Sequence, residues 1–296
     1  MKSFLARSNC TIVGFAMAIA AIVVVPARAD DAPASQSASG PATTQATQPA
    51  SVSVEAERLL KRSQVMSQWS GGLSVEGKLT ARFDVAGRKR EYSADIKTLY
   101  APDGRFRHEL VGIGIVSGDG KHITLYDLRR NAYGTTDAPK KFAEAKDVID
   151  PVVDVLRDEN PFLLIALTPE PQLLLGRGAK EIRTVGSNSI EIVSADAVQV
   201  IDFDPMTCLP VRVRTDLTPR FASRGVTPEA ATAEITYAAP KPQKEFADDA
   251  FTLAIPPAAT EFPIELPKKP EEEELLREAG PATQPTTQPS GEGDGR

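Results

Sequence analysis

Residues able to perform acid–base, nucleophilic or metal chemistry are scarce in this chain of 296 residues, which has two histidines and two cysteines. That is little material for a zinc or haem site, or for a Cys/His nucleophile pair. His108 falls in phase with Phe106 and Leu110 on the apolar face of a predicted strand. No spacing around it matches a catalytic triad. We interpret His108 as a hydrogen-bonded core or cavity histidine.

Three other patterns could indicate chemistry. Residues 112–121 (GIGIVSGDGK) have the glycines of a phosphate loop. In such a loop a Ser or Thr follows the lysine and a helix comes next, but here His122 follows and a strand is predicted. We therefore interpret these residues as hairpin glycines. Asp202 and Asp204 share one side of a strand, as two hydrolytic carboxylates would, but Asp204 also opens an ordinary DPMT turn. Cys208 is interpreted as a small turn residue, with pairing between chains as the alternative. We therefore expect no enzymatic activity, cofactor or metal.

The composition is that of a globular protein, with 41% hydrophobic and 25% charged residues and a net charge of −6. These values exclude a wholly disordered chain and a polytopic membrane protein. They also argue against a nucleic-acid partner, which normally requires a basic excess. The function must then follow from shape and compartment.

The N-terminus has the pattern of a signal for secretion. Lys2 and Arg7 precede an uncharged apolar run over 11–25, and a small-x-small cleavage site ends at Ala29. As a helix this run would reach about 22 Å, short of the roughly 30 Å hydrocarbon core. We predict a signal peptide over 1–29, cleaved near Ala29-Asp30, and a periplasmic mature chain. An uncleaved N-terminal anchor is the alternative.

Two low-complexity segments flank the remaining sequence. Residues 30–53 are rich in Pro, Thr and Gln, and residues 258–296 form an acidic, Pro-rich tail. Neither can bury enough apolar surface to offset the entropy of ordering it, so both are predicted to be disordered. One domain is left, over 54–257.

Within that domain, the first elements are a helix and a pair of alternating strands. Ser53 can cap a helix that ends at Gly71-Gly72, with one buried face predicted for Ala56, Leu59, Leu60, Met66 and Trp69. Strict alternation follows and predicts strands with one wet face. The apolar phases are Val75, Gly77, Leu79, Ala81 and Phe83, then Tyr92, Ala94, Ile96, Thr98 and Tyr100, with a turn predicted at 88–90.

The rest of the domain is a strand meander with one helical insertion. Apolar spacing over 142–156 predicts two helices that meet at Pro151, and Asn160-Pro161 starts a third over 161–167 that is apolar nearly all round. Strands are predicted before it at 106–110, 122–127 and 130–134, and after it at 181–185, 190–194, 198–203, 209–215, 233–237 and 251–255. We predict an α+β fold: an antiparallel, unclosed half-barrel of about ten or eleven strands, covered by the N-terminal helix and a mid-chain helical lid.

The order of several segments resembles the LolA-like lipoprotein-carrier superfamily, in particular its DUF2092-type bacterial periplasmic branch. These segments are SGGLSVEGKLTARFD, LYAPDGRFRHEL, SGDGKHITLYDLRRNAYG, FDPMTCLPVRVR and the ITYAAPKPQKEFADDAFTLAIPP ending. The resemblance implies an unclosed half-barrel whose helix-covered concavity holds acyl chains or engages lipoproteins. Cys208 stands where the resemblance implies Gly in a DPxTGLP-type turn.

Together these features predict a non-enzymatic periplasmic carrier or sensor for an acyl chain or lipoprotein, with membrane contact at most transient. A filled-core scaffold domain of an envelope complex or signalling system, with an envelope protein as partner, is the alternative. The predicted ligand-binding residues are Val75, Leu79, Phe83, Tyr92, Ile96, Phe106, His108 and Leu110 on the sheet, and Phe162, Leu163, Leu164 and Leu167 in the lid.

Overall fold

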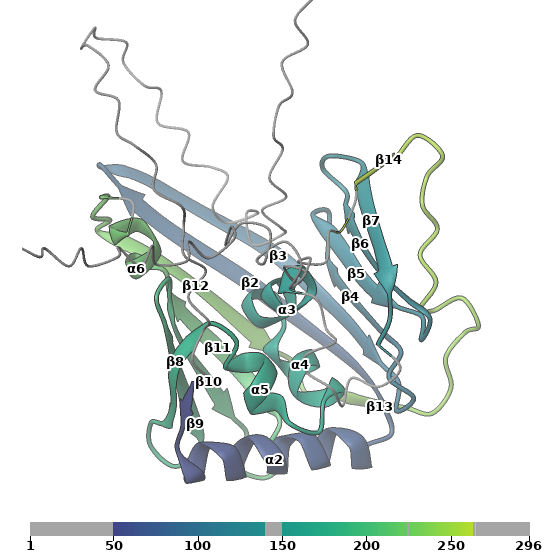
Figure 1. Cartoon of the computed structure of the whole chain (residues 1–296), viewed down its shortest axis with the longest axis horizontal. Helices are drawn as coiled ribbons and strands as arrows, with labels where there is room; N and C mark the ends of the chain where they lie inside the picture. Colours follow the sequence, from purple (N-terminus) through teal and green to yellow (C-terminus); the bar gives the residue numbers. More distant parts are fainter. Residues whose placement is uncertain (1–49, 140–149, 224, 263, 265–296) are drawn as a thin grey trace, which may run out of the picture. The chain divides into compact units, whose positions relative to one another are not determined.

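A computed structural model describes residues 50–139, 150–223, 225–262 and 264. Across these residues one curled sheet of 14 strands runs in the order β1-β8-β9-β10-β11-β12-β2-β3-β4-β5-β6-β7-β14, with β13 paired to β2 beside this path (Figure 1). The strands are β1 Ser51–Val52, β2 Gly72–Val85, β3 Arg88–Tyr100, β4 Phe106–Leu110, β5 Gly114–Gly118, β6 His122–Asp127, β7 Ala132–Asp137, β8 Ala179–Thr184, β9 Ser189–Ser194, β10 Val198–Phe203, β11 Pro210–Asp216, β12 Ala230–Tyr237, β13 Lys241–Gln243 and β14 Thr260–Glu261.

The sheet is antiparallel except at its two edges. There, β1 pairs with β8 and β14 pairs with β7, both in parallel. Each edge is therefore covered by a two-residue strand from one end of the domain. The described residues show no pairing between β1 and β14, so the sheet stays open, and the predicted half-barrel class is confirmed.

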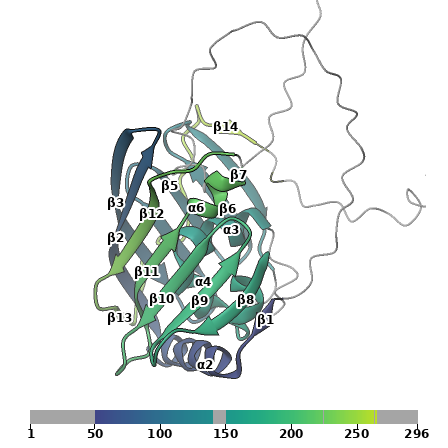
Figure 2. The same cartoon turned by 90° about the vertical axis from the view of Figure 1, so that its left-hand side faces the viewer.

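The helices lie on the concave face of the sheet and across one of its ends (Figures 1 and 2). Their bounds are α2 Val54–Trp69, α3 Asp150–Glu159, α4 Pro161–Leu167, α5 Pro171–Leu175 and α6 Thr218–Ala222. As predicted, Ser53 caps α2 by accepting a hydrogen bond from the Ala56 amide. The α2 helix contacts α4, α5 and β8, while α4 also contacts α3, α5 and β3.

Register determines which residues of neighbouring strands share the concave face. Thr98 pairs with both Val75 and His108, and His108 pairs in turn with Val116, so these side chains form one row on the concave face. Phe106 pairs directly with Gly118, and a Cβ on Gly118 would lie 2.5 Å from the Phe106 ring. The glycine thus leaves room for the ring to lie over the neighbouring strand.

Three sequence predictions were wrong in detail. Trp69 is 81% exposed rather than buried, because it lies nine positions, about two and a half turns, beyond Leu60 and so on the opposite side of α2. Residues 88–90 belong to β3, and the turn falls at Ala86-Gly87. The predicted strand at 251–255 is not one; there the Phe251 carbonyl accepts a hydrogen bond of 2.6 Å from Ser117 Oγ of β5.

Two short helices, α5 and α6, and the strands β1, β5, β13 and β14 were not predicted. These elements are two to five residues long, too short for a periodic pattern to be recognised. The first helix predicted in the insertion, over 142–149, lies outside the described residues.

Candidate functional site

The residues predicted to bind a ligand gather on the concave face and in the helix that covers it. All but Tyr92 are buried, and Tyr92 packs half-buried against the same core. The sheet contributes Val75, Leu79, Phe83, Ile96, Phe106, His108 and Leu110, and α4 contributes Phe162, Leu163, Leu164 and Leu167.

The α4 helix is the part of the cover that the sequence singled out. Asn160 caps it by accepting from the Leu163 amide at 3.2 Å, with Pro161 in its first turn. All seven residues of α4 are buried, because α2, α3, α5 and β3 surround it. In this state the chain's own helices occupy the concave face.

A buried polar cluster fixes the junction between α3 and α4 to the sheet. We call it the junction cluster, and its members are Thr98, His108, Glu159, Asn160 and Tyr237. Asn160 Nδ2 donates to Thr98 Oγ1 at 2.7 Å and lies 3.0 Å from His108 Nδ1. Asn160 Oδ1 accepts from Tyr237 Oη at 3.3 Å, in addition to capping α4. Asn160 thereby links the start of α4 to strands β3, β4 and β12.

These contacts assign the state of His108. Because Asn160 Nδ2 can only donate, His108 Nδ1 must accept, which places the ring proton of the neutral imidazole on Nε2. That nitrogen lies 3.6 Å from Glu159 Oε2 and makes no hydrogen bond within the described part of the chain. The prediction of a hydrogen-bonded core histidine is confirmed.

Burial dominates the electrostatics of this cluster. It raises the pKa of the Glu159 carboxyl, although the neighbouring His108 opposes the shift. Burial also raises the pKa of the Tyr237 hydroxyl, which keeps it protonated as a donor. The raised pKa favours the protonated carboxyl of Glu159, which avoids leaving an isolated carboxylate in the core.

The sequence analysis missed Glu159, Asn160, Thr98 and Tyr237 as parts of a site. One signal was available, since Thr98 is a polar residue in the apolar phase of its strand. Its partner Asn160 lies 62 residues away, and local patterns cannot reveal that contact.

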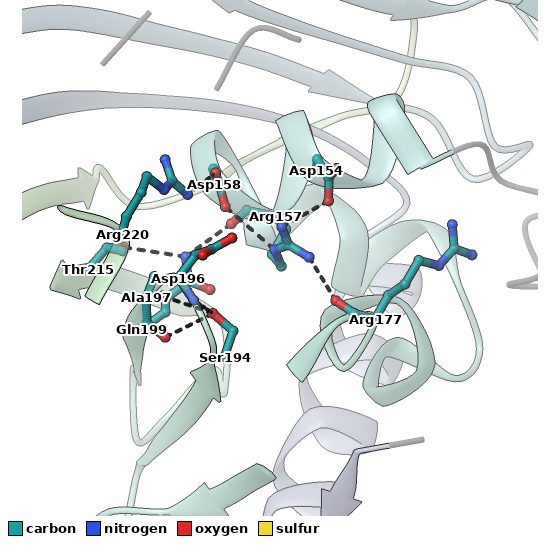
Figure 3. A network of polar contacts seen from close by, with 10 residues as sticks. All are labelled: Asp154, Arg157, Asp158, Arg177, Ser194, Asp196, Ala197, Gln199, Thr215 and Arg220. Carbon is teal, nitrogen blue, oxygen red and sulfur yellow. Dashed lines mark hydrogen bonds and ion pairs between the residues drawn. The ribbon is translucent and has the colours of Figure 1, made fainter. Parts of the chain in front are cut away.

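A second polar arrangement lies at the outer side of α3, in a cleft of about 340 Å³ (Figure 3). Arg157 pairs with Asp154 at 2.9 Å and with Asp158 at 3.5 Å, and it donates to the Arg177 carbonyl at 2.8 Å. Gln199 Nε2 donates to the Arg157 carbonyl at 3.0 Å. The Arg157 guanidinium is neutralised by Asp154 and Asp158 of the same helix. We therefore interpret these contacts as holding α3 against the start of β8 and against β10.

The other candidate residues have structural roles. Asp204 accepts from the Met206 and Thr207 amides, which confirms the turn, and Asp202 pairs with Arg214 at 3.1 Å. Cys208 is buried with a positive φ of 56°, so the predicted turn role is confirmed. Gly112 and Gly120 stand in the β4–β5 and β5–β6 connections, as predicted for hairpin glycines, whereas Gly114 and Gly118 lie in β5, a strand that was not predicted.

Residues 114–265 match a family model described as "Predicted periplasmic protein (DUF2092)", and the chain belongs to this family. The predicted resemblance to that branch is thereby confirmed. No curated protein matches the chain. None of the helices among the described residues is long and apolar enough to span a membrane.

Several solved structures are similar at low identity. A LolA superfamily protein from Nitrosomonas europaea is 8% identical, with a TM-score of 0.38, and the match covers 68% of this chain and 99% of that one. An uncharacterized conserved protein from Thermus thermophilus is 9% identical, with a TM-score of 0.36, over 70% and 98% of the two chains. A putative outer membrane lipoprotein-sorting protein domain from Vibrio parahaemolyticus is 10% identical, with a TM-score of 0.31, over 67% and 97%.

Proposed function

We propose that this protein is a non-enzymatic periplasmic carrier that takes the acyl chain of a lipid or lipoprotein onto the concave face of its half-barrel. The observation that carries the proposal is α4, a wholly apolar helix buried on an open apolar sheet and held at its start by the junction cluster. The signal peptide over 1–29, cleaved near Ala29-Asp30, delivers the chain to the periplasm.

The energetics permit reversible loading. Burying about fifteen methylenes of an acyl chain would contribute about 12 kcal/mol at about 0.8 kcal/mol each. Moving the cover and ordering the ligand reduce that gain. Because α4 is held partly by hydrogen bonds to Asn160, and not by apolar contacts alone, its release has a defined starting point at the α3–α4 junction.

The binding surface has two parts in this proposal. The sheet residues listed above form its floor, and Phe162, Leu163, Leu164 and Leu167 move to cover the chain from the other side. His108 lies between the two parts, so an occupied carrier would present this imidazole near the polar end of the ligand.

The test is ligand binding by the natively purified mature protein. Organic extraction and mass spectrometry should recover a co-purified lipid, and palmitate should displace an apolar fluorescent dye from the protein. Asn160→Ala loosens the junction cluster and should speed dye uptake several-fold. Ser53→Ala, which removes the cap of α2 without touching the concave face, serves as the matched control and should leave uptake unchanged.

A second function, a filled-core scaffold domain, is favoured by the complete burial of α4. It predicts that no lipid co-purifies, that palmitate displaces nothing, and that Asn160→Ala lowers stability without creating dye binding. A crosslinked envelope partner that is lost when residues 30–49 and 265–296 are deleted, with β1, Ser53 and β14 kept in place, would support the scaffold.

A further inference from the structure

Exposed apolar side chains gather at one end of the sheet. The α2 helix starts where β1 leaves the edge beside β8, crosses this end of the sheet, and stops where β2 begins. The β8–β9 and β10–β11 turns lie at the same end, as both views show (Figures 1 and 2). Four large apolar side chains are exposed there: Val54 at 55%, Trp69 at 81%, Val185 at 45% and Met206 at 86%.

The outward side of α2 is also basic. Arg58, Lys61 and Arg62 are exposed, and at 100° per residue they fall on the same side of the helix as Val54 and Trp69. Lys61 Nζ also donates to the Pro169 carbonyl at 3.3 Å. The acidic residues of α2, Glu55 and Glu57, lie in its first turn, and the β10–β11 turn adds Asp204, so basic side chains dominate only from Arg58 onward along the helix. We call Val54, Arg58, Lys61, Arg62 and Trp69, together with the Val185 and Met206 turns, the α2 end.

We propose that the α2 end binds reversibly to an anionic phospholipid surface. Basic side chains beside an exposed indole and apolar turn tips are the combination that holds a helix in the plane of a membrane interface. Charge complementarity selects anionic headgroups, with each Lys or Arg near such a surface strengthening binding about fivefold. The chain as a whole carries −6, so net charge would oppose this binding and only a local basic patch can favour it.

Binding at the α2 end would bring the membrane close to the proposed cover of the concave face. The buried side of α2 packs against α4 and α5, so a bilayer on its outward side would lie one helix away from the proposed cover. The membrane contact does not require the carrier function, and it can be measured in the absence of any acyl-chain transfer.

The sole tryptophan of the chain provides the readout. The full mature protein is titrated with vesicles of phosphatidylglycerol and phosphatidylethanolamine, or of phosphatidylcholine alone. On anionic vesicles the Trp69 emission should shift to the blue, brominated lipids should quench it, and the protein should co-sediment. Binding should weaken as salt is raised.

Paired charge reversals locate the surface. Arg58→Glu with Arg62→Glu should weaken binding at least tenfold, and Met206→Ser should weaken it by a smaller factor. Arg88→Glu with Arg90→Glu makes the same charge change at the start of β3, at the far end of the β2–β3 hairpin, and should leave binding unchanged. Circular dichroism checks that each variant stays folded.

Three outcomes would overturn the proposal. They are no Trp69 shift on anionic vesicles, equal binding to phosphatidylcholine at all salt concentrations, and an equal loss in both paired variants. If Trp69 shows no shift on anionic vesicles, a protein partner becomes the alternative occupant of this surface. Palmitate displacement of the dye, measured separately, would still report on the carrier function.

Discussion

At the scale of single residues, Asn160 connects the cover to the sheet. Its side chain caps α4 and contacts Thr98, His108 and Tyr237 from three strands. A hydrophobic residue of similar size would keep the packing and lose all of these directed contacts. The junction cluster therefore fixes where α4 begins on the sheet as well as how strongly it is held.

Glu159→Gln should reveal the protonation state of the cluster. Because burial raises the pKa of Glu159, its stabilising contribution is present below the unfolded-state pKa and is lost as pH rises through the folded-state pKa. Glutamine imitates the protonated carboxyl at every pH. The unfolding free energy of the variant, relative to the native sequence, should therefore increase with pH, by at most about 1.4 kcal/mol per pH unit.

Urea unfolding between pH 5 and 8 measures this difference. His122→Asn, which removes the other, half-exposed histidine, serves as a control. In that background the pH dependence of the difference in unfolding free energy between Glu159→Gln and Glu159 should stay the same. A Gln variant that is less stable by a constant amount at every pH would show instead that Glu159 is ionised and paired with a charged His108.

Cys208→Gly should be tolerated better than Cys208→Ala. The backbone of Cys208 is left-handed, with φ of 56°, a conformation that costs an L-residue about 1–2 kcal/mol and glycine almost nothing. Both variants lose the buried thiol, so after the larger unfolded-state entropy of glycine is subtracted we expect the glycine variant to be the more stable by about 0.5–1 kcal/mol in thermal or urea unfolding. Cys208→Ala keeps the strained backbone, and equal stability of the two variants would contradict this explanation.

The roles of some of these residues could be predicted from the sequence, and the roles of others could not. Ser53 and Asn160 precede their helices with the expected chemistry, and His108 stands in a clear apolar phase, so local patterns sufficed for all three. Glu159 was not singled out, because an acidic residue near a helix end gives no signal of burial. Its burial depends on how α3 docks, through the Arg157 and Gln199 contacts, and no local pattern encodes that docking.

At the scale of elements, the alternation in β2 and β3 predicted both strands and their buried side. The orientation of α2 was harder, because its 16 residues carry few apolar side chains and Trp69 suggested a core position. The helix instead buries small and polar residues such as Ser63 and Gln64. Apolarity alone therefore gave the wrong side for Trp69, since the chain uses that side chain on the surface.

The pairing of β4 with β5 can be tested at Gly118. Gly118→Ala places a methyl group 2.5 Å from the Phe106 ring, so we expect about 1–3 kcal/mol of destabilisation by urea unfolding. Phe106→Leu in the same chain should recover part of this loss, because it removes the ring that clashes. Additive losses in the double variant would mean that the ring does not lie over Gly118.

At the scale of the whole sheet, both edges are closed to strand addition by segments from the ends of the domain. Thr260 donates its amide to the Asn131 carbonyl at 2.9 Å, and Phe262 donates to the Tyr133 carbonyl at 2.8 Å. An unpaired edge strand is a template for association between chains.

Thr260→Pro should therefore promote self-association. It removes one of the two amide donors that hold β14 on β7, and sedimentation velocity should then detect dimers or larger species as concentration rises. Glu261→Pro is the matched control, since these two β14–β7 amide bonds come from its neighbours. Association of both variants to the same extent would show that β14 does not protect this edge.

The two short edge strands also determine how the molecule responds to mechanical load. β1 and β14 are each two residues long and lie at opposite margins of the sheet. A pull on either terminus would peel off these few bonds before it reached the long central strands. Tension would thus be relieved at the margins, which yield first, while the covered concavity keeps its shape.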